Sequence, residues 1–443
     1  DASQWEPNLY QNTTAIYPFE GNEEWNLTTA MADEAITHMQ ELKEVAPEKP
    51  FFVYYCPGGT HAPHHPTPEW IDKISDMHLF DKGWNKLRET IFNNQKRLGI
   101  MPKNAKLTAW PKELPEWDSK NDLEKKLFIK QMDVYAAYLA YTDHEIGRVI
   151  QSVEDLGQLD NTLIIYINGD NGPSSEGMLD GTPNEFTFFN GAAVPVKAQM
   201  LWYPFWGSNK TFPHFAAEWA WAMSTPFKWV KQVASHFGGT AQGVAMSWPG
   251  HIKDEGGIRR QFHHVIDIVP TILDATGVPK PKIIDGINQR HMDGVSMTYT
   301  WNKENANSPT KHTTQYFEML GNRAIYDHGW VAATTPANLP WAPSTTTPPD
   351  VITGYKWELY NVMEDPTQSN DLAAQMPGKL EGLKKLFYAE AAKYDVFPLD
   401  NTSLARFLSP KPNINQGRTV FTYSGTHTNI TSAAAPNIKN KSY

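Results

Sequence analysis

Residues 162–167 read TLIIYI and are followed at 168–172 by NGDNG. A short, continuous apolar run that ends in Gly, Asn and Asp is typical of a strand buried on both faces and followed by a turn. A second run of this kind, FFVYY at 51–55, ends in Pro and Gly at 57–59. The two runs predict two interior strands, each with a polar loop at its carboxyl end.

Helical periodicity surrounds these strands. Apolar residues recur at three- and four-residue spacing in three stretches, 29–46, 119–156 and 265–276. A chain that alternates strand and helix in this way forms a mostly parallel or mixed sheet flanked by helices. The fold class predicted for residues 1–310 is therefore α/β, and the loops at 60–68 and 168–172 lie where such sheets place their ligands.

The character of the sequence changes after residue 310. Short strand-like runs within 314–360, joined by turns, predict a small antiparallel sheet, and a helix at 378–393 is expected to pack on it. We therefore predict a second, smaller subdomain at 311–399. Residues 400–443 are polar and have no periodicity, which indicates a linker or the start of a further, truncated domain.

Composition excludes several classes of protein. The 39 Lys and Arg residues against 49 Asp and Glu give a net charge of −10 with no basic block, so nucleic-acid binding is not expected. The longest apolar runs have about six residues, whereas a membrane-spanning helix needs about 20, so no membrane span is expected. The single cysteine, Cys56, excludes an intrachain disulfide.

The loop after the first predicted strand contains three histidines, His61, His64 and His65. Imidazole is the commonest zinc ligand, so a zinc site is one interpretation of this loop. Pro63 and Pro66 prevent the helix on which the histidines of an HExxH motif share a face. Each histidine, taken alone, is equally consistent with a polar residue in the wall of a cleft.

Asp170 and Asn171 follow the second predicted strand and lie between two glycines. Adjacent carboxylate and amide oxygens suit a hard cation such as Ca²⁺ or Mg²⁺. Because Ca²⁺ takes about six or more oxygens, other ligands must come from elsewhere. The same dipeptide between glycines is also common in turns, which is the structural alternative.

Lys228 and Lys231 lie ten and seven residues before the pair Gly238 and Gly239 and are candidate functional residues. A solvated position on the surface is the alternative for either lysine. The sequence contains no GxSxG elbow, Walker loop or GxGxxG motif, so it does not indicate the hydrolase and nucleotide-binding classes that carry them.

In their order along the chain, these motifs resemble the sulfatase family within the alkaline-phosphatase superfamily, and are most similar to bacterial arylsulfatases. The resemblance covers roughly residues 1–400. Its motifs are PFFVY (50–54) leading to HAP (61–63), YTDHEIGR (141–148), DNTLI (160–164) leading to GDNG (169–172), TPFKWVK (225–231), IDIVPTILD (266–274), DG (285–286), DGVS (293–296), WELYN (357–361) and EDP (364–366).

The resemblance implies an alkaline-phosphatase-like fold, the hydrolysis of a sulfuric ester, and a role for each candidate residue. Asp170 and Asn171 would ligate a metal ion, Ca²⁺ rather than Mg²⁺. His61 would contact the sulfate and protonate the leaving oxygen. Lys231 rather than Lys228 would bind the sulfate, although its spacing to the Gly-Gly pair is one residue longer than in the family, and Thr240 stands where an Arg usually follows.

One departure concerns the nucleophile. Sulfatases make a formylglycine from the Cys or Ser of a C-x-P/A-x-R motif, and they place an upstream pair of aspartates on the metal. Cys56 begins CPGGT, with Gly and Thr where that motif needs Pro or Ala and Arg. We therefore expect Cys56 to be a buried thiol at a strand end, and the nucleophile to be supplied by a segment upstream of Asp1.

The resemblance therefore indicates an internal fragment, inactive and poorly folded by itself. The complete protein would need a formylglycine-generating enzyme for maturation and would act on a small-molecule or saccharide sulfate ester. The alternatives are a phosphodiesterase or phosphonate hydrolase of the same superfamily, a non-catalytic binding protein with the sulfatase fold, and, last, a zinc hydrolase built on His61, His64 and His65.

The sequence leaves the compartment open. Sequons at Asn12, Asn26 and Asn209 are compatible with secretion and equally with chance. A periplasmic or secreted location is favoured over a cytoplasmic one.

Overall fold

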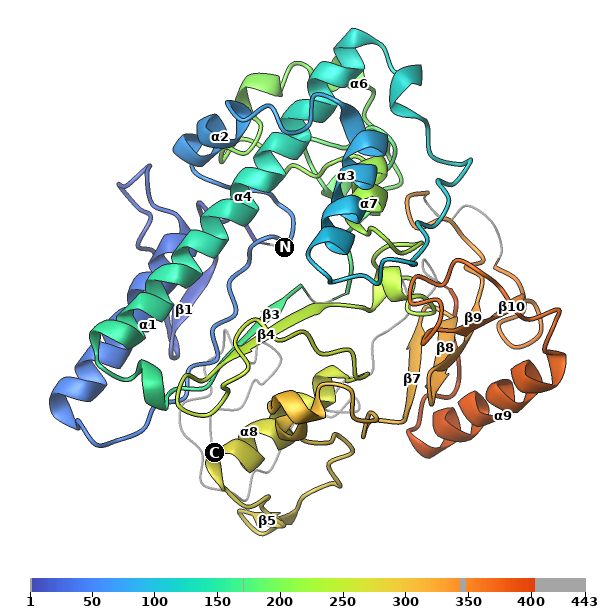
Figure 1. The fold of residues 1–443 in the computed structure, drawn as a ribbon. Coiled ribbons are helices and arrows are strands. Elements are labelled where there is room, and N and C mark those ends of the chain that lie inside the picture. Colours follow the sequence, from blue (N-terminus) through green and yellow to red (C-terminus); the bar gives the residue numbers. More distant parts are fainter. Residues whose placement is uncertain (1, 170, 343–347, 403–443) are drawn as a thin grey trace, which may run out of the picture.

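The computed structural model describes residues 2–169, 171–342 and 348–402 (Figure 1). Its longer helices are α1 (Leu27–Val45), α2 (Pro68–Ser75), α3 (Gly83–Arg97), α4 (Asp122–Asp155), α7 (Ala217–Met223), α8 (Ile268–Thr276) and α9 (Pro377–Lys393), with two single turns, α5 (Phe186–Phe189) and α6 (Val196–Gln199). Its strands are β1 (Leu9–Gln11), β2 (Thr14–Ile16), β3 (Ile164–Asn168), β4 (Gly243–Ser247), β5 (Ile283–Ile284), β6 (Ile287–Asn288), β7 (Thr314–Met319), β8 (Asn322–Asp327), β9 (Trp330–Thr334) and β10 (Trp357–Asn361). None of the helices in these described residues is long and apolar enough to cross a bilayer.

The long helix α4 organises the first part of the chain, with α1 and α2 packed along it (Figure 1). It begins in a capping box, in which the Asn121 side chain accepts the N–H of Glu124 and the Glu124 carboxylate accepts the N–H of Asn121. The buried face of α4 includes Phe128, which joins a cluster of large aromatic side chains. Trp84 is fully buried in this cluster, with its ring centroid 5.4 Å from those of both Phe128 and Trp219. The cluster fixes α3, α4 and α7 against one another.

The parallel sheet expected between these helices is not found in the described residues. β3 pairs antiparallel with β4, Ile164 opposite Ser247, and every other strand pair in the described part of the chain is also antiparallel. Residues 51–55 do not form a strand, and Phe52 and Tyr54 are 75% and 84% exposed. The apolar run at 51–55 therefore finds no neighbouring strand in the described residues to cover its side chains, and the prediction of a mostly parallel or mixed sheet is not confirmed.

The C-terminal part has the architecture that the sequence predicted. Strands β10, β9, β8 and β7 lie in that order in one antiparallel sheet, and α9 packs on it (orange and red in Figure 1). Leu359 of the sheet and Phe387 of the helix meet in its core and are fully buried. The boundaries at 310 and 399 stay a prediction, and residues 403–443, most of the expected linker, lie outside the described residues.

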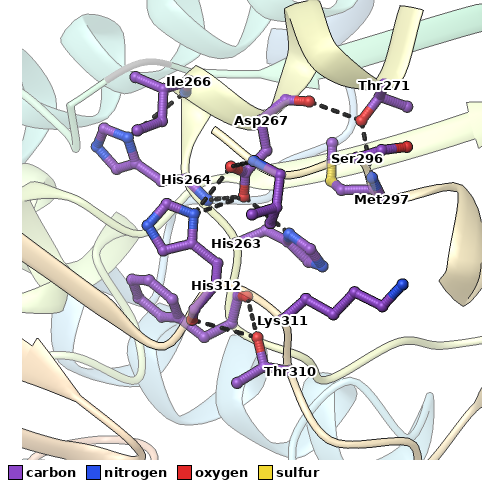
Figure 2. Close-up of polar contacts among 12 residues, drawn as sticks. His263, His264, Ile266, Asp267, Thr271, Ser296, Met297, Thr310, Lys311 and His312 are labelled. Atoms are coloured by element: carbon purple, nitrogen blue, oxygen red, sulfur yellow. Dashed lines mark hydrogen bonds and ion pairs between the residues drawn. The ribbon is translucent and has the colours of Figure 1, made fainter. Parts of the chain in front are cut away.

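Asp267, just before α8, connects the start of that helix to His312, which lies two residues before β7 (Figure 2). Its buried carboxylate accepts hydrogen bonds from Nδ1 of His263 and Nδ1 of His312, both at 2.8 Å, and from the backbone N–H of His264 and Val295. Burial alone would raise the pKa of Asp267, but these hydrogen bonds together hold it well below its usual range. Burial also opposes protonation of His312, but Asp267 outweighs it and raises the pKa of that imidazole.

Substituting Asp267→Asn should lower the free energy of unfolding by about 3 kcal/mol near neutral pH, because it leaves the buried His312 and the partly buried His263 facing a neutral amide. A raised pKa in the folded state means that the contribution of His312 is complete below its unfolded pKa and is lost as the pH rises through the folded pKa. The difference between wild type and variant, measured by urea denaturation, should therefore be larger at pH 6 than at pH 8.5.

Asp274→Asn is the matched control for this prediction. Asp274 lies on α8 and accepts hydrogen bonds from the hydroxyls of Ser296 and Thr298 rather than from histidines. Its substitution should cost the same at both pH values. An Asp267→Asn effect that is equal at the two pH values would contradict the role assigned to His312.

Candidate active site

The structure brings together His61 and Lys231, which are 170 residues apart in the sequence. Nζ of Lys231 lies 2.8 Å from Nε2 of His61, and Nδ1 of His61 lies 2.8 Å from the carbonyl oxygen of Ala62. A carbonyl can only accept, so in the neutral imidazole this pattern assigns the proton to Nδ1 and leaves Nε2 to accept from the ammonium. His61 is exposed, so the pair is open to solvent on one side.

Glu176 is a third member of this cluster, and the sequence analysis missed it. Its Oε2 lies 3.5 Å from Nζ of Lys231 and accepts the Ser174 hydroxyl at 3.0 Å, while its Oε1 accepts the Gln232 amide at 2.7 Å. Burial would raise the pKa of this carboxyl, but Lys231 and the neighbouring His214 outweigh it and lower the pKa. Glu176 is therefore a carboxylate at neutral pH and balances the charge of Lys231.

A close backbone contact places Lys231 beside the loop that follows β3. The N–H of Lys231 donates to the carbonyl of Pro173 at 3.0 Å. Gly172 has a φ of +84°, and a Cβ added to it would lie 2.1 Å from the carbonyl oxygen of Gly238. A Cβ at Gly238 would in turn lie 2.2 Å from the carbonyl oxygen of Lys228. Only glycine fits at these two positions, one in the loop after β3 and the other the first residue of the Gly-Gly pair.

The chain turns sharply on both sides of Lys231. Trp229 and Gln232 have φ values of +69° and +75°, a region that costs residues other than glycine roughly 1–2 kcal/mol each. Because of these turns, Lys228 and Lys231 face different neighbours. Nζ of Lys228 lies 2.9 Å from Oε2 of Glu358 in β10, so Lys231 and not Lys228 lies beside His61.

The expected metal ligands are described only in part. Asp170 lies outside the described residues, whereas Asn171 is described and lies between Gly169, with a φ of +93°, and Gly172. Among the described residues, no group of three or more His, Cys, Asp and Glu side chains could hold a metal ion.

The zinc interpretation of the histidine loop is wrong. His65 is buried and uses both ring nitrogens, Nδ1 accepting the N–H of Gln4 at 3.2 Å and Nε2 lying 2.7 Å from the carbonyl oxygen of Thr211. Burial lowers the pKa of His65 to about 4. His64 is buried with its ring stacked on Phe215. These two side chains support the loop that presents His61.

The expectation for Cys56 was wrong in one respect. Its thiol is exposed rather than buried, because residues 51–55 before it do not enter a sheet.

Known proteins resemble this chain in sequence. A model of the sulfatase family matches residues 3–278. An uncharacterised sulfatase of Schizosaccharomyces pombe is 28% identical over 354 residues, which are 78% of this chain and 58% of the relative. An arylsulfatase of Klebsiella aerogenes is 25% identical over 282 residues, 63% of this chain and 56% of the relative. The chain thus spans a little over half the length of these relatives.

A solved structure agrees on the fold. The crystal structure of Ps i-CgsB superposes with a TM-score of 0.51 at 16% identity, covering 90% of this chain and 61% of the other. At this identity the likeness concerns the α/β fold alone.

Substituting Glu176→Gln should lower the free energy of unfolding by about 1–3 kcal/mol at pH 7, because the amide that replaces Oε1 or Oε2 meets a donor on Gln232 or Lys231. A pKa that is lowered in the folded state gives stability that is present above the unfolded pKa and is lost as the pH falls through the folded pKa. The difference between wild type and variant, from urea denaturation, should therefore shrink below about pH 4.

Glu185→Gln is a control with the opposite sign. Glu185 is also buried, its Oε1 has no hydrogen-bond partner, and burial raises its pKa to about 7. Above that pH the buried carboxylate lowers the free energy of unfolding of the wild type, so the variant should be at least as stable as wild type at pH 8. Equal losses for the two variants at pH 8 would contradict the charge assignment.

Proposed function

Because this chain belongs to the sulfatase family, we propose that it contributes to the hydrolysis of a sulfuric ester and that His61 and Lys231 contact the sulfate group. The observation that carries the proposal is the 2.8 Å contact between Nζ of Lys231 and Nε2 of His61. A cationic donor and an imidazole that point at each other can both turn to an anion placed between them.

Each of the two residues has a distinct part in the proposed reaction. The ammonium of Lys231 stabilises the non-bridging oxygens of the sulfate, and Glu176, which accepts from it on the far side, keeps it oriented and charged. As the S–O bond breaks, negative charge develops on the leaving oxygen. Once the sulfate replaces His61 as the partner of Lys231, Nε2 can take up a proton from solvent and pass it to that oxygen, while the Nδ1–H bond to the carbonyl of Ala62 holds the ring in place.

The metal and the nucleophile are part of the proposal. Asp170 and Asn171 would supply some of the oxygens of a Ca²⁺ site, preferred over Mg²⁺, and the cation would neutralise charge on the sulfate. The nucleophile would be a formylglycine outside these 443 residues, made by a formylglycine-generating enzyme, because Cys56 lies in a sequence unlike C-x-P/A-x-R.

The substrate and the compartment follow from the same proposal. The substrate would be a small-molecule or saccharide sulfate ester, and the protein would work in the periplasm or outside the cell. A phosphodiester or phosphonate hydrolase and a non-catalytic sulfate-binding protein are the other outcomes of the test below.

The test compares leaving groups in a polypeptide that joins these residues to a formylglycine nucleophile, assayed with Ca²⁺. His61→Ala should reduce kcat about 100-fold or more for an alkyl sulfate but much less for 4-nitrophenyl sulfate, whose leaving group needs little protonation. Lys231→Met should reduce kcat/KM for both esters by about 100- to 1,000-fold, because the ammonium acts on the sulfate itself.

Lys112→Met is the matched control, since the Lys112 side chain is 91% exposed and pairs weakly with Glu113. It should leave both esters unaffected. Faster turnover of phosphate than of sulfate esters would favour the phosphodiesterase alternative. Sulfate binding without turnover would favour a binding protein, and equal losses for both leaving groups in His61→Ala would contradict its role as the acid.

A further inference from the structure

The segment that carries Lys231 is held by the C-terminal sheet. We call residues 225–239 the lysine loop. Two side chains of this loop, Lys228 and His236, meet the same carboxylate oxygen, Oε2 of Glu358 in β10, at 2.9 and 3.1 Å. The hydroxyls of Tyr360 and Thr335 also donate to the Glu358 carboxylate. Glu358 thus binds the lysine loop at two points, three residues before Lys231 and five residues after it.

Two further hydrogen bonds tie the lysine loop to the C-terminal part. The amide of Asn322, at the start of β8, donates to the carbonyl of Gln232 at 3.3 Å. The N–H of Phe237 donates to Oε1 of Gln368, beyond β10, at 2.8 Å. The lysine loop is therefore held in position by the C-terminal part of the chain, whereas His61 comes from the N-terminal part.

Charge and burial make Glu358 the centre of this network. Glu358 and His236 are 7% and 1% exposed. Burial would raise the pKa of Glu358, but the hydrogen bond from His236 and the charge of Lys228 outweigh it and hold the pKa well below its usual range. A buried carboxylate with four donors is ordered only while all of them stay in place, so loss of its charge releases both ends of the loop.

The network is not itself a hydrolytic triad. The Ser235 hydroxyl lies 2.9 Å from Nδ1 of His236, and Nε2 of His236 meets Glu358, which is the order of a nucleophile, a base and an acid. Ser235 and His236 are each 1% exposed, however, so no substrate can reach the hydroxyl. The three residues are structural partners.

We infer that Glu358 is a positioning residue for Lys231, acting through Lys228 and His236, so that the C-terminal sheet sets where the sulfate-binding ammonium lies. The inference rests on the proposed function for the role of Lys231. It also assigns Lys228: this lysine is the link between the loop and the sheet, and not a ligand of the sulfate. Trp229 and Gln232, which have left-handed backbone conformations, lie between the two points of attachment. The attachments keep their φ angles from changing, so Lys231 stays directed at His61.

The test combines two measurements, made in the presence of Ca²⁺ on the polypeptide that joins these residues to the formylglycine nucleophile and on its Glu358→Gln variant. Amide hydrogen exchange, followed by mass spectrometry, should become at least tenfold faster in peptides covering 226–240 while peptides from α4 stay unchanged. Isothermal titration with inorganic sulfate should show a Kd about tenfold higher, because the ammonium is misplaced rather than removed.

Two further variants keep the test decisive. Lys228→Met, a milder change at a half-buried side chain, should shift both readouts in the same direction, and Lys228→Arg should restore them. Glu381→Gln is the control: Glu381 lies on α9, which packs on the same sheet, and its carboxylate pairs with Lys384 of the same helix. It should change neither readout.

The outcomes separate this inference from the proposed function. Unchanged loop exchange and sulfate affinity in Glu358→Gln, even with reduced stability, would overturn the positioning role. A wild-type chain that binds no sulfate would contradict the proposed function itself, whatever the exchange shows.

Discussion

The close contact between Gly172 and Gly238 is the constraint on which the site depends. It lets the backbone of the loop that follows β3 approach the backbone of the lysine loop more closely than a side chain at either position would allow. The hydrogen bond from Lys231 to the carbonyl of Pro173 is made at this crossing. Glu176 and Lys231 therefore reach one place although they are 55 residues apart in the sequence, and His61 joins them from another loop.

Charge balance then decides what the cluster can do. One ammonium lies between a neutral imidazole acceptor and a buried carboxylate, so it is held on both sides without a bound ligand. An anion that replaces His61 as the partner of Lys231 leaves Nε2 free to take a proton, which is the state that a general acid needs.

Local patterns in the sequence predicted what depends on local physics. The periodicity that marked 119–156 and 378–393 corresponds to α4 and α9, and the run at 162–167 overlaps β3. Strand pairing depends on partners far along the chain, so the apolar run at 51–55 was a poor guide: its residues pair with no described strand. The same limit explains why the antiparallel pairing of β3 with β4 was not foreseen.

The residues of the candidate site were also predicted only in part from the sequence. The resemblance in motif order singled out His61 and Lys231, and the structure places them together. Glu176 was missed because no spacing marks a carboxylate that is buried by a distant loop. The choice between Lys228 and Lys231 depends on the left-handed turns at Trp229 and Gln232, which a propensity argument does not predict for such residues.

The most direct measurement of the central claim is the number of protons taken up when inorganic sulfate binds. Titration calorimetry near pH 7.5 in two buffers with different ionisation enthalpies gives this number. If sulfate takes the place of His61 as the partner of Lys231, binding should be accompanied by uptake of a substantial fraction of one proton, and His61→Ala should abolish that uptake. Sulfate binding with no proton uptake, or with the same uptake in His61→Ala, would contradict the account.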